Sequence, residues 1–247
     1  MQTIYEKPKC ISDTPFHYCP GCGHGMAHRI VGEVIDELGI VNNTIAVVPV
    51  GCAVMAYDYL ECDVFEALHG RAPAVATGVK RTLSDKIVFT YQGDGDLAAI
   101  GMAETIHAAA RGEAITVIFI NNTIYGMTGG QIAPTTLIGQ KTQTSPNGRD
   151  LHTQGYPLKM CEILSNIDGV SYIERCALDT VVHINAAKRA IKKGFEYQIK
   201  HKAYSFIELL SPCPTNWKMT PEQAVKRVSE EMVEYYPLGV YLDKIGE

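Results

Sequence analysis

Apolar residues recur at two different spacings along this chain, and the spacing separates the expected helices from the expected strands. Ile30, Val34 and Leu38 lie four positions apart, which predicts a helix that starts near residue 25 and that Gly39 ends. Short runs rich in β-branched residues predict buried strands instead. On these patterns we expect helices over residues 72–83, 97–111 and 179–201, and strands over residues 44–48, 86–91, 115–120, 170–173 and 204–210.

The order of these elements indicates the fold class. One expected helix lies between strands 86–91 and 115–120, and this β-α-β order is typical of parallel strands that helices cover. We therefore expect an α/β fold with a mostly parallel sheet and helices on both faces. Residues 1–247 are expected to form a single domain, with an extended N-terminal arm over residues 1–18 and an amphipathic helical tail over residues 221–236.

Composition limits the class of protein further. Apolar residues make up 46% of the 247 residues and charged residues 20%, which is enough for a buried core and a polar surface. The net charge of −5 argues against a general nucleic-acid binder, which needs a basic face. The longest uncharged apolar stretch, residues 44–57, is shorter than the ~20 residues of a membrane-spanning helix. No apolar signal segment follows Met1, so we expect a cytoplasmic protein with reduced thiols.

A glycine-rich turn between an expected strand and an expected helix is the strongest functional signal. The sequence Gly93-Asp94-Gly95-Asp96 lets the backbone approach a phosphate closely, and the free amides at the helix start favour an anion. Asp94 is a hard oxygen ligand suited to magnesium or calcium, and Asn122, after the next strand, adds a neutral oxygen. Both lie at carboxyl ends of expected strands, where open α/β sheets bind ligands. The pattern predicts a metal–diphosphate site.

The same residues have two other interpretations. Gly-Asp-Gly-Asp alone is often a plain turn, and Asn121-Asn122 alone often ends a strand. The flanking strands and the 25 residues between Gly95 and Asn121 argue against this interpretation. A dinucleotide-binding fold is disfavoured because no G-x-G-x-x-G motif follows a strand.

Eight cysteines raise a separate question. Cys19-Pro-Gly-Cys22 is a C-x-x-C motif at the start of the first expected helix. A thioredoxin-like redox pair has its motif at such a helix start, but that fold needs a β-α unit ahead of it, and here only the arm precedes Cys19. A structural zinc site often uses two C-x-x-C pairs, and this chain has one. The third interpretation is an iron–sulfur cluster, which takes thiolates from scattered positions.

Two further cysteines lie in loops that follow expected strands. Cys52 follows strand 44–48, and Cys213 lies between two prolines after strand 204–210. Both loops are expected at the same edge of the sheet as the glycine-rich turn. Cys62, Cys161 and Cys176 are expected to be packing residues, whereas Cys10, in the arm, fits either role.

Taken together, the two predicted sites resemble one family. The Gly-Asp-Gly and Asn-Asn pair resembles the thiamine diphosphate-binding motif, and residues 16–217 resemble the β subunit of 2-oxoacid:ferredoxin oxidoreductases. The resemblance implies the diphosphate-binding type of the thiamine diphosphate-binding fold. It is carried by CPGCGH at 19–24, PVGC at 49–52, HGRA at 69–72, GDGD at 93–96, NN at 121–122 and SPCPT at 211–215.

The resemblance implies two sets of inorganic ligands. Asp94, Asn122 and the main-chain oxygen of Ile124 would ligate Mg²⁺. One [4Fe–4S] cluster would take its four thiolates from Cys19, Cys22, Cys52 and Cys213.

The resemblance also implies contacts to thiamine diphosphate. His69 is the candidate catalytic residue, through a polar contact near the cofactor; a surface or capping histidine is the alternative. The residues expected at the cofactor are Gly51, Cys52, His69, Gly70, Arg71, Gly93, Asp94, Gly95, Asp96, Asn122, Ile124, Tyr125, Gly126, Met127 and Thr128.

The implied reaction is oxidative decarboxylation of a 2-oxo acid to acyl-CoA and CO₂, with coenzyme A as acyl acceptor and ferredoxin as electron acceptor. The expected partners are a pyrimidine-domain α subunit, a γ subunit and a small ferredoxin-like subunit. We expect the chain to be inactive alone, because in this family the α subunit supplies the glutamate that contacts the aminopyrimidine ring.

The substrate is a narrower question. Residues 125–131 and 141–146 resemble subunits for 2-oxoisovalerate or 2-oxoglutarate, and we favour 2-oxoisovalerate. A 2-oxoglutarate pocket needs a cation for the distal carboxylate, for which His24, His28 and Lys141 are available. Two other classes stay open: a non-oxidative thiamine-dependent decarboxylase subunit, and a non-catalytic iron–sulfur or zinc subunit.

Overall fold

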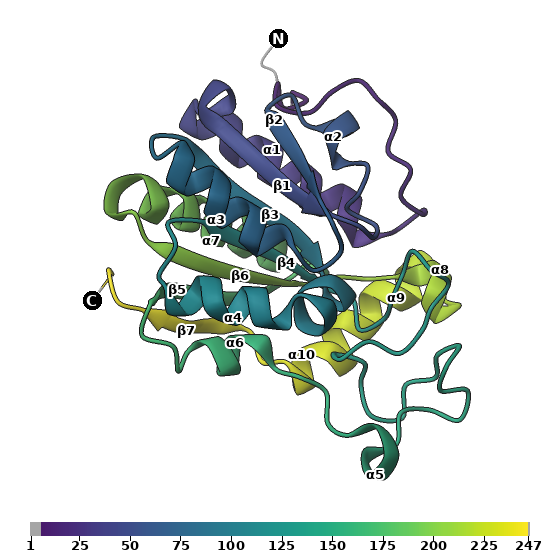
Figure 1. Ribbon diagram of the computed structural model, residues 1–247. Coiled ribbons are helices and arrows are strands. Elements are labelled where there is room, and N and C mark those ends of the chain that lie inside the picture. Colours follow the sequence, from purple (N-terminus) through teal and green to yellow (C-terminus); the bar gives the residue numbers. More distant parts are fainter. Residues whose placement is uncertain (1–5, 247) are drawn as a thin grey trace.

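A seven-stranded sheet forms the centre of the protein in the computed structural model, which describes residues 6–246 (Figure 1). Its strand order is β2-β1-β3-β4-β6-β5-β7. Every neighbouring pair is parallel except β5 and β7, which confirms the expected mostly parallel α/β fold. The strands are β1 (Thr44–Pro49), β2 (Asp63–Ala67), β3 (Ile87–Gly93), β4 (Thr116–Asn121), β5 (Val170–Ala177), β6 (Tyr204–Leu210) and β7 (Gly239–Asp243).

Helices cover both faces of this sheet (Figure 1). On one face pack α1 (Gly23–Leu38) and α7 (Val181–His201); on the other pack α3 (Ala72–Thr82), α4 (Met102–Ala110) and α6 (Met160–Leu164). Every residue of β1, β4 and β6 is buried between these layers, which explains why their sequences are continuous runs without polar alternation. The shorter elements are α2 (Ala56–Tyr59), α5 (Leu151–Gln154), α8 (Pro214–Trp217), α9 (Pro221–Arg227), α10 (Val233–Tyr235), the 3₁₀ turn η1 (Val41–Asn43) and the π turns η2 (Asp96–Ile100) and η3 (Val228–Met232).

The structure differs from the expected elements at a few places with local causes. The expected helix 97–111 begins as the π turn η2, and another π turn, η3, interrupts the expected tail helix 221–236. Two strands were not expected, β2 and β7. Both are edge strands with mostly exposed or half-buried residues, so neither has the apolar run of a central strand. Among the described residues, no helix combines the length and the apolar character that a membrane span requires.

Aromatic contacts fix the part of the N-terminal arm that precedes the C-x-x-C motif. The Phe16 ring packs edge-on against Tyr59, with centroids 4.8 Å apart. Tyr18 stacks on His24 of α1 at 5.0 Å, and its hydroxyl lies 2.7 Å from Nε2 of His28. These contacts place residues 19–22 directly at the start of α1. The first five residues of the expected arm lie outside the described range.

The long segment between β4 and α5 has its own support. The Arg149 guanidinium donates hydrogen bonds to the main-chain oxygens of residues 133, 134 and 136 and of residues 154–156, and so joins the middle of the segment to the end of α5 and the residues after it. Ile124 and Leu137 contribute to a third apolar cluster, together with residues of α8, α9 and η3. The C-terminal tail therefore packs under this segment.

The parallel order brings the functional segments of the sequence together. Strands β1, β2, β3, β4 and β6 are all parallel, so their carboxyl ends meet at one edge of the sheet. The segments that leave this edge carry Cys52, His69, Asp94, Asn122 and Cys213.

Candidate active site

Asp94 follows β3 and is 2% exposed. Its Oδ2 accepts hydrogen bonds from the Thr135 hydroxyl at 2.6 Å and the Ile124 N–H at 3.1 Å, and its Oδ1 accepts from the Gly95 N–H at 2.8 Å. Burial nevertheless raises the pKa of Asp94 to about 7. A nearby cation favours the ionised form of a carboxyl group. The buried Asp94 carboxylate therefore fits the role of a metal ligand.

A tight turn after β4 brings Asn122 close to Asp94. The Ile124 N–H lies 3.1 Å from Asp94 Oδ2 and 3.3 Å from Asn122 Oδ1, so both candidate ligand oxygens surround one amide. Thr123, which lies between Asn122 and Ile124, has a φ of 59°. This left-handed conformation costs a β-branched residue of order 1–3 kcal/mol. The turn therefore needs support from its surroundings.

Glycines shape the loops on either side of this turn. A Cβ atom at Gly95 would lie 2.2 Å from the Tyr125 ring, and a Cβ at Gly126 would lie 3.1 Å from the Cys52 sulfur. The loops after β1, β3 and β4 thus approach one another closely only because glycines occupy these two positions.

A cleft opens between these loops at the carboxyl edge of the sheet. No Lys or Arg of residues 6–246 lines it. It is lined by His24, Val50, Gly51, Cys52, Ala53, His69, Gly93, Asp94, Gly95, Asp96, Asn122, Ile124, Tyr125, Gly126, Met127 and Thr128.

The loop after β2 contributes His69 to the cleft. Its Nδ1 lies 2.5 Å from Oδ1 of Asp96, and Gln92 Nε2 donates to the other Asp96 oxygen at 2.7 Å. Gly70 and Arg71 are not among the lining residues. The Gly70 N–H donates to Asp96 Oδ1 at 2.5 Å, while Arg71 forms an ion pair with Glu104. Their expected contact with a cofactor stays a prediction.

Four cysteines gather beside the same cleft. Every pair among the thiols of Cys19, Cys22, Cys52 and Cys213 is close enough to interact electrostatically. Each of the four thiols is therefore within electrostatic reach of the other three. Burial raises the pKa of Cys22 and of Cys52 to about 12. Within residues 6–246, no group of three His, Cys, Asp or Glu side chains is arranged to hold a single metal ion.

The loops that carry these cysteines contact each other directly. The Gly23 N–H donates to the Pro212 carbonyl at 3.1 Å, which joins the C-x-x-C motif to the Cys213 loop. Asn216 Nδ2 lies 3.4 Å from the Cys213 sulfur and donates to the Gly126 carbonyl at 3.0 Å. The thiol group and the glycine-rich cleft are thus neighbouring parts of one site.

The other four cysteines lie apart from this group. Cys161 and Cys176 are buried, as expected of packing residues. Cys10 is fully buried in the core and its thiol contacts Cys62, which packs against the same cluster.

Comparison with known proteins identifies the family. The family model described as "Thiamine pyrophosphate enzyme, C-terminal TPP binding domain" matches residues 49–209. Ketoisovalerate oxidoreductase subunit VorA of Methanothermobacter thermautotrophicus is 49% identical over 247 residues, which is 100% of this chain and 52% of VorA. The 2-oxoglutarate synthase subunit KorB of Methanocaldococcus jannaschii is 40% identical over 225 residues, 89% of this chain and 79% of KorB.

The chain belongs to the 2-oxoacid:ferredoxin oxidoreductase family. The resemblance seen in the sequence is thus confirmed, including the thiamine diphosphate-binding domain. The fold agrees as well: a 2-oxoglutarate:ferredoxin oxidoreductase from Magnetococcus marinus, solved with 2-oxoglutarate, coenzyme A and succinyl-CoA bound, has a TM-score of 0.77. The match is 24% identical and covers 98% of this chain and 86% of that one. This chain spans about half the length of VorA.

Some residues at the site were not among the expected cofactor contacts. His24 lines the cleft, and its presence in the CPGCGH stretch was an available signal. Burial lowers the pKa of His24 and of His28 to about 3, so both imidazoles are neutral at neutral pH. Lys141 lies outside the cleft, in a separate hollow. Thr135, the closest partner of Asp94, lies 41 residues away in the chain, and no local pattern marks it.

Proposed function

We propose that this chain is the thiamine diphosphate-binding subunit of a complex that oxidatively decarboxylates a 2-oxo acid to acyl-CoA and CO₂ and passes electrons to ferredoxin. One observation carries the proposal: the buried Asp94 carboxylate, next to an asparagine turn, lies beside four mutually interacting thiols. The Asp94 carboxylate and the asparagine turn suit a metal–diphosphate, and the four thiols suit an iron–sulfur cluster.

In this proposal Asp94, Asn122 and the Ile124 carbonyl hold Mg²⁺, and the glycine-rich turn receives the diphosphate. Bound thiamine diphosphate supplies the electron sink that side chains lack when a 2-oxo acid loses its carboxylate. The Asp96 carboxylate favours the proton on Nδ1 of His69, which leaves Nε2 to accept a hydrogen bond from a ligand in the cleft. The roles of Tyr125, Gly126, Met127 and Thr128 are to line the cofactor site.

Cys19, Cys22, Cys52 and Cys213 hold one [4Fe–4S] cluster in this proposal. Burial raises the pKa of the Cys22, Cys52 and Cys213 thiols and so favours their neutral forms when no metal is bound, whereas metal binding requires thiolates. Iron therefore compensates the charge that these buried positions otherwise exclude. A cluster beside the cleft suits a reaction whose acceptor, ferredoxin, takes one electron at a time.

The cleft favours an apolar substrate. Val50, Ala53 and Met127 line it. His24, a buried histidine in the cleft wall, is neutral at neutral pH because burial lowers its pKa to about 3. Among residues 6–246 no lysine or arginine lines the cleft to pair with the distal carboxylate of 2-oxoglutarate. We therefore favour 2-oxoisovalerate, in agreement with the name of the VorA relatives.

Partner subunits complete the site in this proposal: a pyrimidine-domain α subunit, a γ subunit and a small ferredoxin-like subunit. Leu68, next to His69, is 79% exposed, and Met127 in the cleft wall is 49% exposed. Exposed apolar side chains around a cleft are typical of a surface that a partner covers. The isolated chain should therefore lack oxidative decarboxylase activity.

Substitution of Asp94 tests the metal role. Asp94→Ala removes the only carboxylate among the proposed Mg²⁺ ligands, so Mg²⁺-dependent binding of thiamine diphosphate should weaken by more than the roughly 10–100-fold that loss of an outer-shell partner costs. Calorimetric titration of the complex measures this. Asp85→Ala, at the opposite end of β3 and exposed, is the control. Unchanged binding by the Asp94 variant refutes the assignment.

Serine substitutions test the cluster ligands. Cys52→Ser and Cys213→Ser should each lower the iron and sulfide content of anaerobically purified complex, because serine is a poor ligand for iron in place of a thiolate. Cys176→Ser removes a buried thiol outside the group and should leave the iron content unchanged. Full iron content in either of the first two variants shows that the ligand set is wrong.

Turnover of two substrates tests the choice of 2-oxo acid. The purified complex should show a higher kcat/KM for 2-oxoisovalerate than for 2-oxoglutarate, because within the described part of the chain no lysine or arginine lines the cleft. A clear preference for 2-oxoglutarate overturns the substrate assignment and leaves the cofactor assignment intact.

A further inference from the structure

The first asparagine of the Asn121-Asn122 pair has no role in the proposed metal site, yet it is the more deeply buried of the two. Asn121 is fully buried at the end of β4, whereas Asn122 is 5% exposed. The Nδ2 of Asn121 donates a hydrogen bond to Glu208 Oε1 at 2.7 Å, and the Oδ1 of Asn121 accepts one from the Thr123 N–H at 3.2 Å. Asn121 thus connects a buried carboxylate to the strained turn.

The register of the sheet explains how these side chains meet. Glu208 of β6 lies opposite Phe119 of β4, and Asn121, two residues further along β4, presents its side chain on the same face. Glu208 is the charged residue in a strand, Tyr204–Leu210, that is otherwise apolar except for one serine and one tyrosine hydroxyl. A carboxylate in such a strand requires partners.

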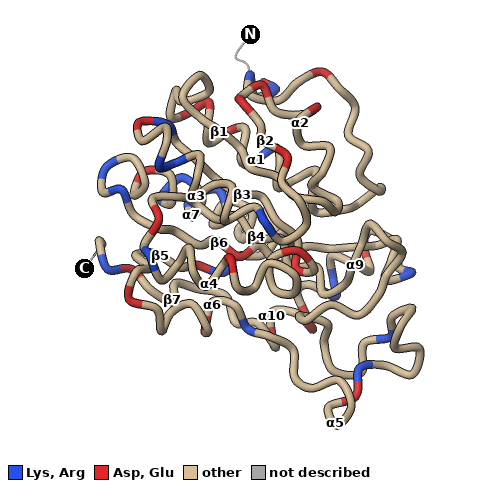
Figure 2. Tube along the Cα trace, in the orientation of Figure 1, with Lys and Arg blue, Asp and Glu red and all other residues tan. Residues whose placement is uncertain are grey.

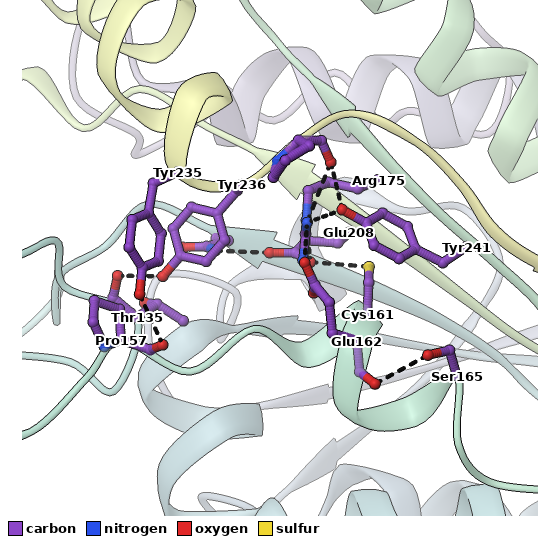
Figure 3. A network of polar contacts seen from close by, with 12 residues as sticks. Thr135, Pro157, Cys161, Glu162, Ser165, Arg175, Glu208, Tyr235, Tyr236 and Tyr241 are labelled. Carbon is purple, nitrogen blue, oxygen red and sulfur yellow. Dashed lines mark hydrogen bonds and ion pairs between the residues drawn. The ribbon is translucent and has the colours of Figure 1, made fainter.

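Arg175 of β5 supplies the main partner (Figure 3). Its Nε donates to Glu208 Oε2 at 2.8 Å, and the Cys161 thiol lies 3.0 Å from the same oxygen. Both charged side chains of the pair are fully buried. Arg175 also donates to Glu162 of α6 and to the Pro237 carbonyl, so its position is fixed from two further sides. Glu208 Oε1 is therefore left facing Asn121.

This arrangement fixes which way the Asn121 amide points. A carboxylate only accepts hydrogen bonds and a main-chain N–H only donates, so the NH₂ group must face Glu208 and the oxygen must face Thr123. Leucine has a similar size but makes neither bond, and aspartate places a second carboxylate against Glu208.

The Asn121–Thr123 bond supports the left-handed residue directly. The Thr123 carbonyl accepts from the Thr136 hydroxyl at 2.7 Å and from Gln140 Nε2 at 3.0 Å, while the Thr123 N–H donates to Asn121 Oδ1 and also lies near the Asp94 carboxylate. The next residue, Ile124, donates its N–H to Asp94. Any change in the conformation of Thr123 therefore displaces both Asn122 and Ile124.

We propose that Asn121, oriented by the buried Glu208–Arg175 pair, is the positioning residue that fixes the turn 122–124 and thereby the Asn122 and Ile124 oxygens of the metal site. The inference rests on the proposed function. A purely stabilising role is a poor explanation of the ion pair, because well-packed apolar side chains often replace buried pairs without loss of stability.

The test compares Asn121→Leu with Gln198→Leu in the assembled complex. Gln198 is 2% exposed and bonds to Val88 and Thr116 near the amino ends of β3 and β4, so its loss removes comparable buried hydrogen bonds at the opposite edge of the sheet. Equilibrium dialysis gives the affinity for thiamine diphosphate over a range of Mg²⁺ concentrations, and thermal unfolding without ligands gives stability. Asn121→Leu should weaken binding roughly 10–100-fold, whereas Gln198→Leu should lower stability and leave the affinity unchanged.

A second substitution makes the mechanism itself testable. Glycine adopts left-handed conformations at little cost, so Thr123→Gly should recover part of the lost affinity when combined with Asn121→Leu. If Asn121→Leu does not fold, the double variant is compared with Thr123→Gly alone, and the double variant should bind less tightly. Wild-type affinity in the Asn121 variant, or equal loss of affinity in the Gln198 variant, overturns the inference. Absence of Mg²⁺-dependent binding in the unmodified complex overturns the proposed function first and this inference with it.

Discussion

The parallel order of the central strands is the constraint on which the site depends. A parallel sheet places every strand's carboxyl end at one edge, so five segments that are distant in sequence meet there without any direct sequence signal between them. Two helix layers bury the sheet on both faces, and this fixes the height and direction of each strand end. The positions of Cys52, Asp94, Asn122 and Cys213 follow from this arrangement.

Charge then determines what the edge can bind. The cleft combines a buried carboxylate, an amide oxygen and glycine-rich backbone, while of the adjacent cysteines Cys213 is buried and Cys22 and Cys52 are half-buried. Burial opposes ionisation of the Asp94 carboxyl group and of the Cys22, Cys52 and Cys213 thiols. A bound cation would stabilise the ionised form of each. Lysines and arginines are spread along the chain (Figure 2), yet among residues 6–246 none of them lines the cleft.

Much of this architecture could be predicted from the sequence, for physical reasons. The central strands appear as continuous apolar runs because both of their faces are buried, and Gly39 ends α1 because it adopts a left-handed conformation. Strands β2 and β7 could not be predicted, since edge strands have no such run. The two π turns depend on local packing that periodicity does not encode. The partners of Asp94 and Asn121, namely Thr135 and Glu208, lie 41 and 87 residues away, so only the folded register identifies them.

The central claim is that one chain holds thiamine diphosphate and an iron–sulfur cluster side by side. The most direct test is chemical analysis of the complex, purified without oxygen, for thiamine diphosphate, iron, sulfide and zinc per copy of this chain. With allowance for any iron held by partner subunits, our account predicts nearly one thiamine diphosphate and about four irons and four sulfides, the composition of one four-thiolate cluster. Thiamine diphosphate without iron, as in a non-oxidative decarboxylase, or iron or zinc without thiamine diphosphate, would contradict it.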